Sequence, residues 1–361
     1  MRQIYKPVAD GTQVTFCKNT AKRHKQLFTK PSKKINLQED SMLKTKITDM
    51  LDIEHPIVGG AMMWISRSEY VAAMSEAGGL GIMASANYKS KESFARAVDS
   101  MKTLTSKPYG VNINLFPAMT QIDNNEYIDV MADNGLKIVE TSGHHAPDEL
   151  VARFKDLRMT WIHKCVGVRY AKKVEAMGAD VVTVVGYENG GATGRLDIGT
   201  MVLVPVVVDA VNVPVIGGGG ISDGRGLAAV LSLGAEAIIM GTRLLVTKEA
   251  PIHDNIKTAL LNASELDTML VMRSLNATHR VLNNEAANKC LELENNNAEF
   301  MEVYEVIKGE NAKEMYDEGD VGKGILACGQ GIGLTHDIPT LKELFDRMAL
   351  EAEGALQKFS N

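Results

Sequence analysis

The sequence predicts an α/β fold: a closed (β/α)8 TIM barrel with a helical lid subdomain inserted near the C-terminus. Eight short apolar segments typical of buried parallel strands alternate with amphipathic segments typical of helices over about 185 residues. Several expected helices end in glycine directly before the next strand, as a helix C-cap commonly does. Eight strands that are each followed by a helix favour a closed barrel over an open sheet.

Each element follows from its local pattern. The expected strands are short apolar runs that cover residues 56–60, 80–84, 109–114, 137–141, 160–165, 180–185, 214–217 and 236–240. The helices between them show apolar residues at helical spacing and cover residues 68–77, 91–104, 124–133, 147–157, 169–177, 201–211 and 223–233. A last helix is expected from residue 339 to about residue 359.

Composition and charge divide the chain into four segments. Residues 1–41 hold nine Lys/Arg and three Asp/Glu, a charge of +6, which leaves −12 for the rest of a chain whose total is −6. We expect this stretch to be a loosely ordered basic extension. The barrel is expected over residues 42–247, a charged, Asn-rich helical subdomain over 248–320, and a segment that completes the barrel over 321–361.

The overall composition excludes several classes of protein. An apolar fraction of 45% and a charged fraction of 23% are ordinary for a soluble protein, and the negative net charge gives no indication of nucleic acid. No apolar run approaches the roughly 20 residues that span a bilayer. The four cysteines lie far apart, which argues against a zinc site or disulfide framework. We expect a cytoplasmic protein, although the basic extension leaves organellar targeting open.

Two consecutive strand ends carry glycine turns that point to a phosphorylated ligand. The expected seventh strand runs into four glycines at 217–220, and the eighth runs into Gly241-Thr242. Glycine turns beside a helix start present bare backbone N–H groups, which bind phosphate, and in (β/α)8 barrels this site commonly follows strands seven and eight. The alternative is that these glycines only permit tight turns.

The other strand ends describe a large and mostly neutral site. They offer backbone donors and Asn amides but few carboxylates. No HExxH, GxSxG or carboxylate pair occurs, so metalloprotease, serine hydrolase and glycosidase functions lose support, and no metal site is expected. Glycines for a phosphate and amides for a ring edge suit a planar phosphorylated cofactor, and FMN is the simplest candidate. A phosphate-sugar lyase or isomerase stays possible only without flavin.

Longer motifs carry a resemblance to a known family. They are His55-Pro56-Ile57-Val58-Gly59-Gly60-Ala61-Met62, Ala77-Gly78-Gly79-Leu80-Gly81, Gly110-Val111-Asn112-Ile113, Gly178-Ala179-Asp180, Glu188-Asn189-Gly190-Gly191, Pro214-Val215-Ile216 with the glycine run, and Leu233-Gly234-Ala235-Glu236-Ala237 with Gly241-Thr242-Arg243. With them the chain from about residue 42 onward resembles the nitronate monooxygenase (2-nitropropane dioxygenase-like) family, which includes flavin-dependent enoyl-ACP reductases. The resemblance implies FMN contacts at Gly60, Ala61, Met62, Asn112, Gly190, Gly191, Gly219, Gly220, Gly241 and Thr242.

One departure from the family pattern concerns proton transfer. The family pattern E-x-G-G-H ends in a histidine beside the flavin, whereas this chain has Ala192 at that place. An alanine cannot exchange a proton. His144 and His145, at the end of the expected fourth strand, and Tyr187, after the sixth, are the candidates to replace it. The alternatives are two solvated loop histidines and a tyrosine that only packs.

Three functions follow from these observations. The leading one is an FMN-dependent oxidation of nitronates or similar carbon acids with O2. The second is reduction of an enoyl thioester or a quinone by NADH or NADPH on the same cofactor, with acyl carrier protein as a partner if the thioester is ACP-bound. The third, favoured by Ala192, is a flavin-binding protein that has lost catalysis. All three take a small-molecule ligand, and a homodimer remains open.

Overall fold

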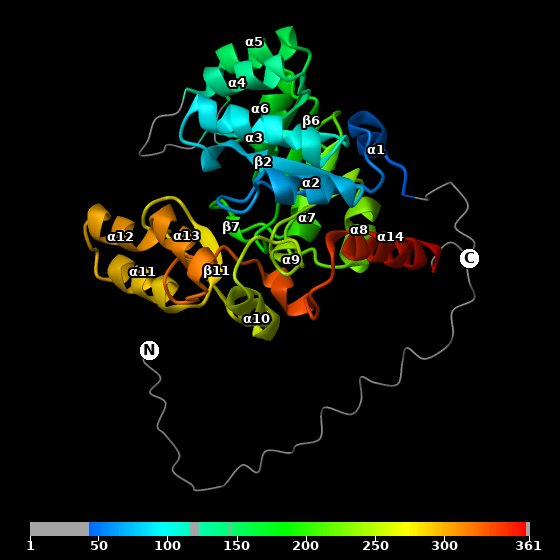
Figure 1. Ribbon diagram of the computed structural model, residues 1–361. Coiled ribbons are helices and arrows are strands. Elements are labelled where there is room, and N and C mark those ends of the chain that lie inside the picture. Colours follow the sequence, from blue (N-terminus) through cyan, green and yellow to red (C-terminus); the bar gives the residue numbers. More distant parts are fainter. Residues whose placement is uncertain (1–42, 116–122, 144–145, 359–361) are drawn as a thin grey trace, which may run out of the picture. The chain divides into compact units, whose positions relative to one another are not determined.

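The computed structural model describes residues 43–115, 123–143 and 146–358, and the basic extension lies outside them. Eight parallel strands form a closed barrel, which confirms the predicted fold (Figure 1). In barrel order the strands are β1 (Ile57–Gly59), β2 (Leu80–Ala84), β3 (Tyr109–Asn114), β4 (Ile138–Ser142), β5 (Thr160–Cys165), β6 (Val181–Val185), β8 (Val215–Gly218) and β9 (Ala237–Met240). Pairing of β9 with β1, in the register Val58 to Ile239, closes the barrel.

Helices follow the strands and cover the outside of the barrel (Figure 1). They are α2 (Ser68–Glu76), α3 (Lys91–Leu104), α4 (Asn124–Asp133), α5 (Asp148–Asp156), α6 (Val168–Met177), α7 (Thr200–Val208) and α8 (Gly224–Ser232). Their ends are capped by side chains and by glycine. Ser90 and Ser93 form a capping box at α3, the Asp223 carboxylate caps α8, and Gly178 ends α6 at a φ of 102°.

A short helix that the sequence analysis did not anticipate, α1 (Lys46–Leu51), closes the N-terminal end of the barrel. The Thr45 hydroxyl before it donates to the carbonyl of Glu236, just before β9, at 2.6 Å. Ile47 and Leu51 are buried with the apolar side chains that fill the barrel interior, namely Val58, Leu80, Ile82, Ile138, Ile162, Val181, Ile216 and Ile239. The ligand site must therefore lie at the opposite end.

The segment after β9 forms the lid. A short helix α9 (Thr242–Leu245) leads into α10 (Asp254–Asn262), the strands β10 (Thr268–Val271) and β11 (His279–Leu282), and the helices α11 (Glu285–Asn295), α12 (Phe300–Ile307) and α13 (Gly309–Glu318). The lid thus contains strands in addition to the expected helices. Strand β11 pairs antiparallel with β10 on one side and, on the other, with β7 (Gly191–Ala192) from the loop after β6.

The C-terminal segment returns from the lid to the barrel wall. After the 3-10 helix η2 (Gln330–Leu334), α14 (Leu341–Gln357) packs against α8 and α2, where the helix following β9 belongs. His55 Nε2 lies 3.2 Å from an Asp346 oxygen, and the buried Arg243 forms an ion pair with Asp337 at 2.7 Å. These contacts fasten α14 and the preceding loop to the strands.

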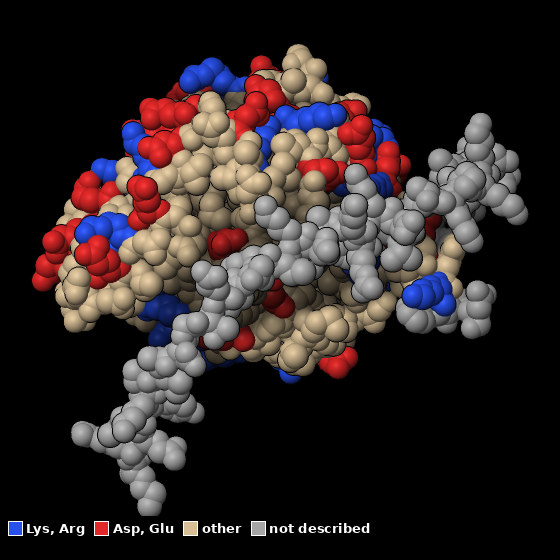
Figure 2. All heavy atoms as spheres, turned by 90° about the horizontal axis from the view of Figure 1, so that it is seen from below, with Lys and Arg blue, Asp and Glu red and all other residues tan. Residues whose placement is uncertain are grey.

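Charge is spread over the face of the molecule seen in Figure 2. Acidic and basic side chains lie interspersed there, and neither sign forms a continuous patch. Within the described residues, every helix is too short or too polar to cross a membrane.

Candidate active site

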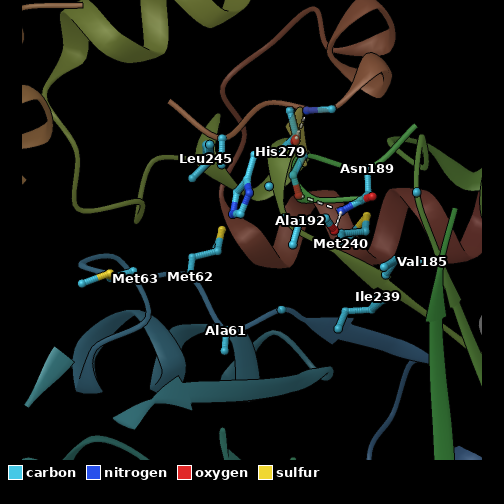
Figure 3. A pocket seen from close by; sticks show the side chains of 18 of the residues that line it. Ala61, Met62, Met63, Val185, Asn189, Ala192, Ile239, Met240, Leu245 and His279 are labelled. Carbon is cyan, nitrogen blue, oxygen red and sulfur yellow. Dashed lines mark hydrogen bonds between the residues drawn. The ribbon is translucent and has the colours of Figure 1, made fainter. Parts of the chain in front are cut away.

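A cavity of about 540 Å³ lies at the C-terminal ends of the strands, between the barrel and the lid (Figure 3). Its floor comes from residues that follow β1, β5, β6, β8 and β9, and its roof comes from α12, α13, β11 and the loop before η2. A volume of this size is typical of small-molecule and cofactor sites.

The turn after β8 is built so that only glycine fits. A Cβ on Gly218 would lie 2.5 Å from Ile239 Cγ2, and one on Gly219 would lie 2.6 Å from the Thr200 hydroxyl oxygen. Gly219 and Gly220 have φ angles of +107° and +70°, which L side chains rarely adopt. Within the described residues the Gly220 N–H donates to no acceptor, and both glycines line the cavity. The turn therefore offers an unpaired donor to an anionic ligand.

The turn after β9 lies beside it and is fixed by its neighbours. The Thr242 hydroxyl accepts a hydrogen bond from the Gly329 N–H at 2.9 Å, and the Arg243 guanidinium donates to the Val246 carbonyl. Gly241 has open space at its Cβ position, with the Met62 sulfur 3.8 Å away as the nearest atom. Its N–H also has no acceptor within the described chain. Two adjacent turns thus present donors to one cavity.

The end of β1 supplies another part of the floor. The Gly60 N–H donates to the Met240 carbonyl at 2.8 Å, which continues the barrel ladder past the strand. The Ser66 hydroxyl accepts from the Met62 N–H at 2.9 Å. The Trp64 indole donates to the Gly309 carbonyl of α13 at 2.8 Å, so the loop after β1 is attached directly to the lid.

The polar side chains of the loop after β6 form hydrogen bonds within the loop and to the start of α7. The Glu188 carboxylate accepts from the Thr200 N–H and hydroxyl, both at 2.9 Å for Oε2, and so joins the loop to the start of α7. The Asn189 amide donates to the Ala192 carbonyl at 3.0 Å (Figure 3). A Cβ on Gly190 would lie 2.7 Å from the Gly329 nitrogen. The four residues Glu188–Gly191 therefore shape the wall through close backbone packing.

A buried polar cluster lies behind the cavity wall at β3, β4 and β5. Glu140 is fully buried, and its Oε2 accepts from the Asn112 amide at 2.6 Å and lies 3.4 Å from Lys164 Nζ. Its other oxygen has no partner in the described chain, which is unusual for a buried carboxylate. Ser142 and Lys164 line the cavity and connect the cluster to it. Burial raises the pKa of the neighbouring Cys165 thiol to about 11, so this thiol is not a nucleophile at neutral pH.

The roof of the cavity is largely apolar and carries one imidazole. Met272, Ile307, Ala312, Tyr316 and Ile325 line it, and burial raises the pKa of the Tyr316 phenol. His279 at the start of β11 projects into the cavity toward Met62 (Figure 3). The combination is a polar floor of backbone donors beneath an apolar roof.

Nine of the ten residues proposed to bind the cofactor line this one cavity, although they come from four separate strand ends. They are Gly60, Ala61, Met62, Gly190, Gly191, Gly219, Gly220, Gly241 and Thr242. Asn112 lies behind the cavity wall, where its side-chain amide donates hydrogen bonds to Glu140 and Ser142.

The proposed proton-transfer residues have a different outcome. Tyr187 does not line the cavity. The Arg280 guanidinium stacks over its ring, 4.6 Å from the ring centroid, and its hydroxyl accepts a hydrogen bond from Arg273 at 3.4 Å. His144 and His145 lie outside the described residues.

Sequence reasoning assigned no role to Lys164 and did not single out His279. Lys164 lies two residues after the barrel-filling Ile162 on β5, so both side chains are on the inward face of the strand. A lysine at an inward position of a buried strand is a sign of function that the sequence can show. His279 had no such sign, because its place depends on pairing between β11 and β7, which are 87 residues apart in sequence at the pair His279–Ala192.

A (β/α)8 barrel with glycine turns after its last two strands and a lid over them defines a class of cofactor- and phosphate-binding enzymes. The chain belongs to the nitronate monooxygenase family, whose model matches residues 44–351. It is 34% identical over 349 residues to a (3aS,4S,5R,7aS)-5-hydroxy-7a-methyl-1-oxo-octahydro-1H-indene-4-carboxyl-CoA dehydrogenase of Rhodococcus jostii, covering 86% of this chain and 96% of the relative. A probable nitronate monooxygenase of Staphylococcus saprophyticus is 29% identical, covering 68% and 81%.

Solved structures agree with this assignment. The structure of FabK from Thermotoga maritima superposes with a TM-score of 0.81 at 34% identity, covering 88% of this chain and 98% of that one. A nitroalkane oxidase from Streptomyces ansochromogenes superposes with a TM-score of 0.73 at 26% identity, covering 86% and 99%. The protein is therefore a member of an oxidoreductase family, as the sequence analysis predicted.

Proposed function

We propose that the protein is an FMN-dependent oxidoreductase whose substrate is an acyl thioester of CoA or acyl carrier protein. The observation that supports this cofactor is the pair of glycine turns after β8 and β9, in which the unpaired N–H groups of Gly220 and Gly241 belong to residues that line one cavity. Such donors suit the dianionic phosphate of FMN.

The rest of the floor suits a planar ring. Gly60, Gly190 and Gly191 bring backbone close to the cavity without side chains, and Ile239 and Met240 add apolar surface. Bound FMN would supply a two-electron acceptor and donor. The chain's own part is to hold the phosphate, cover the ring from water with the lid, and present Lys164, which its contact with Glu140 keeps in place.

The roof supports the choice of an acyl thioester. The apolar side chains of Met272, Ile307 and Ile325 form a wall that a compact, polar nitronate would not use but an acyl group would bury. The relative that is a carboxyl-CoA dehydrogenase is aligned over 96% of its length, whereas the staphylococcal nitronate monooxygenase is aligned over 81%. NADH or NADPH would serve as the second substrate.

Oxidation of nitronates with O2 is the second candidate, favoured by the match to the nitronate monooxygenase model over residues 44–351. A flavin-binding protein without catalysis is the third, favoured by Ala192. The three differ in what exchanges electrons with the flavin.

One titration separates them. The purified protein is expected to show flavin absorbance, to be bleached anaerobically by NADH or NADPH, and to regain its colour when an enoyl-CoA or enoyl-ACP is added. Bleaching by a nitronate, with recovery in air, would select the second candidate. A flavin that neither reductant bleaches would select the third, and a protein that holds no FMN even when it is supplied would refute the cofactor.

A further inference from the structure

His279 lies in the cavity opposite Ala192. Among the residues that the structure describes, it is the one histidine that lines the cavity, and it is half-buried there. Its partner in the β11–β7 ladder is Ala192, which lines the same cavity. The Thr193 N–H donates to the Thr278 carbonyl at 3.1 Å, which makes Ala192 and His279 a non-hydrogen-bonded antiparallel pair. In such a pair the Cα atoms are about 4.5 Å apart and both side chains leave the same face.

The hydrogen bonding of the ring fixes its tautomer. His279 Nδ1 lies 2.6 Å from the Ala277 carbonyl oxygen. A carbonyl can only accept, so Nδ1 must carry the proton, and the lone pair of the neutral ring is then on Nε2. Burial lowers the pKa of this imidazole, against which the Ala277 hydrogen bond acts in the opposite direction. The neutral base therefore predominates at neutral pH.

We propose that His279 is the acid–base residue that exchanges a proton with the α-carbon of the acyl thioester. This inference rests on the proposed function. In the oxidative direction Nε2 takes the proton from Cα, the electron pair of that C–H bond forms the Cα=Cβ double bond, and bound FMN would supply the acceptor for the hydride lost from Cβ. In the reductive direction reduced FMN would supply the hydride to Cβ, and the Nε2–H of the imidazolium returns the proton to Cα.

The other titratable groups of the cavity are less suited to this role. Lys164 on β5 forms an ion pair with the buried Glu140 carboxylate at 3.4 Å, and an ammonium group has no lone pair with which to accept a proton. Burial holds the pKa of Cys165 on β5 and of Tyr316 on α13 above their ordinary values. Arg280, the neighbour of His279 on β11, turns away to the Tyr187 carbonyl at 3.1 Å.

Three variants test the proposal on the protein as purified, with FMN bound. His279→Ala is expected to lower turnover by about 10²–10⁴-fold, the usual contribution of an acid–base group, without loss of the flavin spectrum. His336→Ala removes an exposed histidine outside the cavity and is the matched control. In the double variant His279→Ala/Ala192→His, the imidazole moves to the facing strand of the same pair, and at least about tenfold of the lost turnover should return.

The pH profile separates proton transfer from a structural role. In the parent, the acidic limb of oxidative kcat/KM reports the lowered pKa of a base, and this limb should disappear in His279→Ala. A parent-like limb in the variant, turnover within a few-fold of the parent, or a comparable loss in His144→Ala or His145→Ala instead of His279→Ala would overturn the proposal.

A second readout does not depend on turnover. Nitrogen-15 NMR of histidine-labelled protein, with the signal assigned by its absence in His279→Ala, should show the Nδ1–H tautomer at pH 8. The Nε2–H tautomer would refute the assignment of the base. A parent that reduces no thioester but oxidises a nitroalkane would refute the proposed substrate alone; the same variants are then compared on the nitroalkane, which also loses a proton from carbon. If the parent turns over neither substrate, the tautomer decides.

Discussion

A charge placed at Gly241 should expel FMN, and the structure allows the electrostatic effect to be isolated. Gly241 has a φ of −130°, so a side chain there brings no left-handed strain, and its Cβ would have the Met62 sulfur at 3.8 Å as its nearest neighbour. It is also the N-cap of α9, a position that Asp and Asn both favour. Gly241→Asp and Gly241→Asn therefore differ mainly by one negative charge beside the proposed phosphate site.

The expected difference follows from Coulomb's law. Two unit charges about 5 Å apart at an effective dielectric constant of about 20 repel by about 3 kcal/mol. Since each 1.4 kcal/mol or so is a factor of ten, the Asp variant should bind FMN about a hundredfold more weakly than the Asn variant. Any loss from filling the cavity, or from the new side chain capping the same N–H groups, is shared by both variants and cancels in the ratio.

Fluorescence titration of the deflavinated proteins with FMN measures this ratio, and thermal unfolding of the same samples without FMN is the control. Melting temperatures should agree, because exchange between two good N-cap residues changes the free energy of unfolding by only about a few tenths of a kcal/mol. Raising the salt concentration should narrow the ratio through screening. Kd values for the two variants that agree within about threefold at low salt would show that the phosphate of FMN does not lie at this turn.

Three further predictions address stability, reactivity and the extension. Asp337→Asn removes the partner of the buried Arg243 and should destabilise the fold by about 1.5–3 kcal/mol, seen by urea unfolding at pH 7. The pKa of Asp337 is lowered first by the Arg347 hydrogen bond, so its stabilisation is present above the ordinary carboxyl pKa and is lost as pH falls; the gap between parent and variant should close in acid, and a constant gap would contradict this. Burial raises the pKa of Cys165 and Cys290 to about 11 and of Cys328 to about 12, so iodoacetamide at pH 8 should label none of them in native protein but all three in urea, as mapped by mass spectrometry. Deleting residues 1–41, which precede the first barrel strand at Ile57, should leave a soluble protein that still binds FMN, and loss of either property would show that the extension supports the barrel.

The barrel could be read from sequence because its signals are local. The expected strands at 80–84, 109–114 and 160–165 and the helices at 91–104 and 124–133 have the observed bounds. The strands are apolar runs, and the two helices combine helical spacing with an N-cap, Ser90 for α3 and Asp123 for α4. The glycine run after β8 was equally visible, since Gly219 and Gly220 have positive φ angles that other residues rarely adopt.

What the sequence did not reveal depends on contacts between distant segments. The six-residue helix α1 is stabilised by burial of Ile47 and Leu51 in the barrel rather than by its own pattern. Strand β7 has two residues and exists only because β11 lies beside it. The same pairing brings His279 into the cavity, whereas a search along the chain led to histidines at strand ends.

The ladder between β7 and β11 has a consequence for recombination within the family. The lid does not stand on the barrel as a separable module, since one of its three strands is encoded between β6 and α7, far upstream of the insertion. A chimera that exchanges residues 248–320 alone would leave the donor's β11 beside a foreign edge strand. Transferring a relative's substrate preference to this protein would thus require exchange of both the β6–α7 loop that contains β7 and residues 248–320, while the glycine turns of this protein are kept.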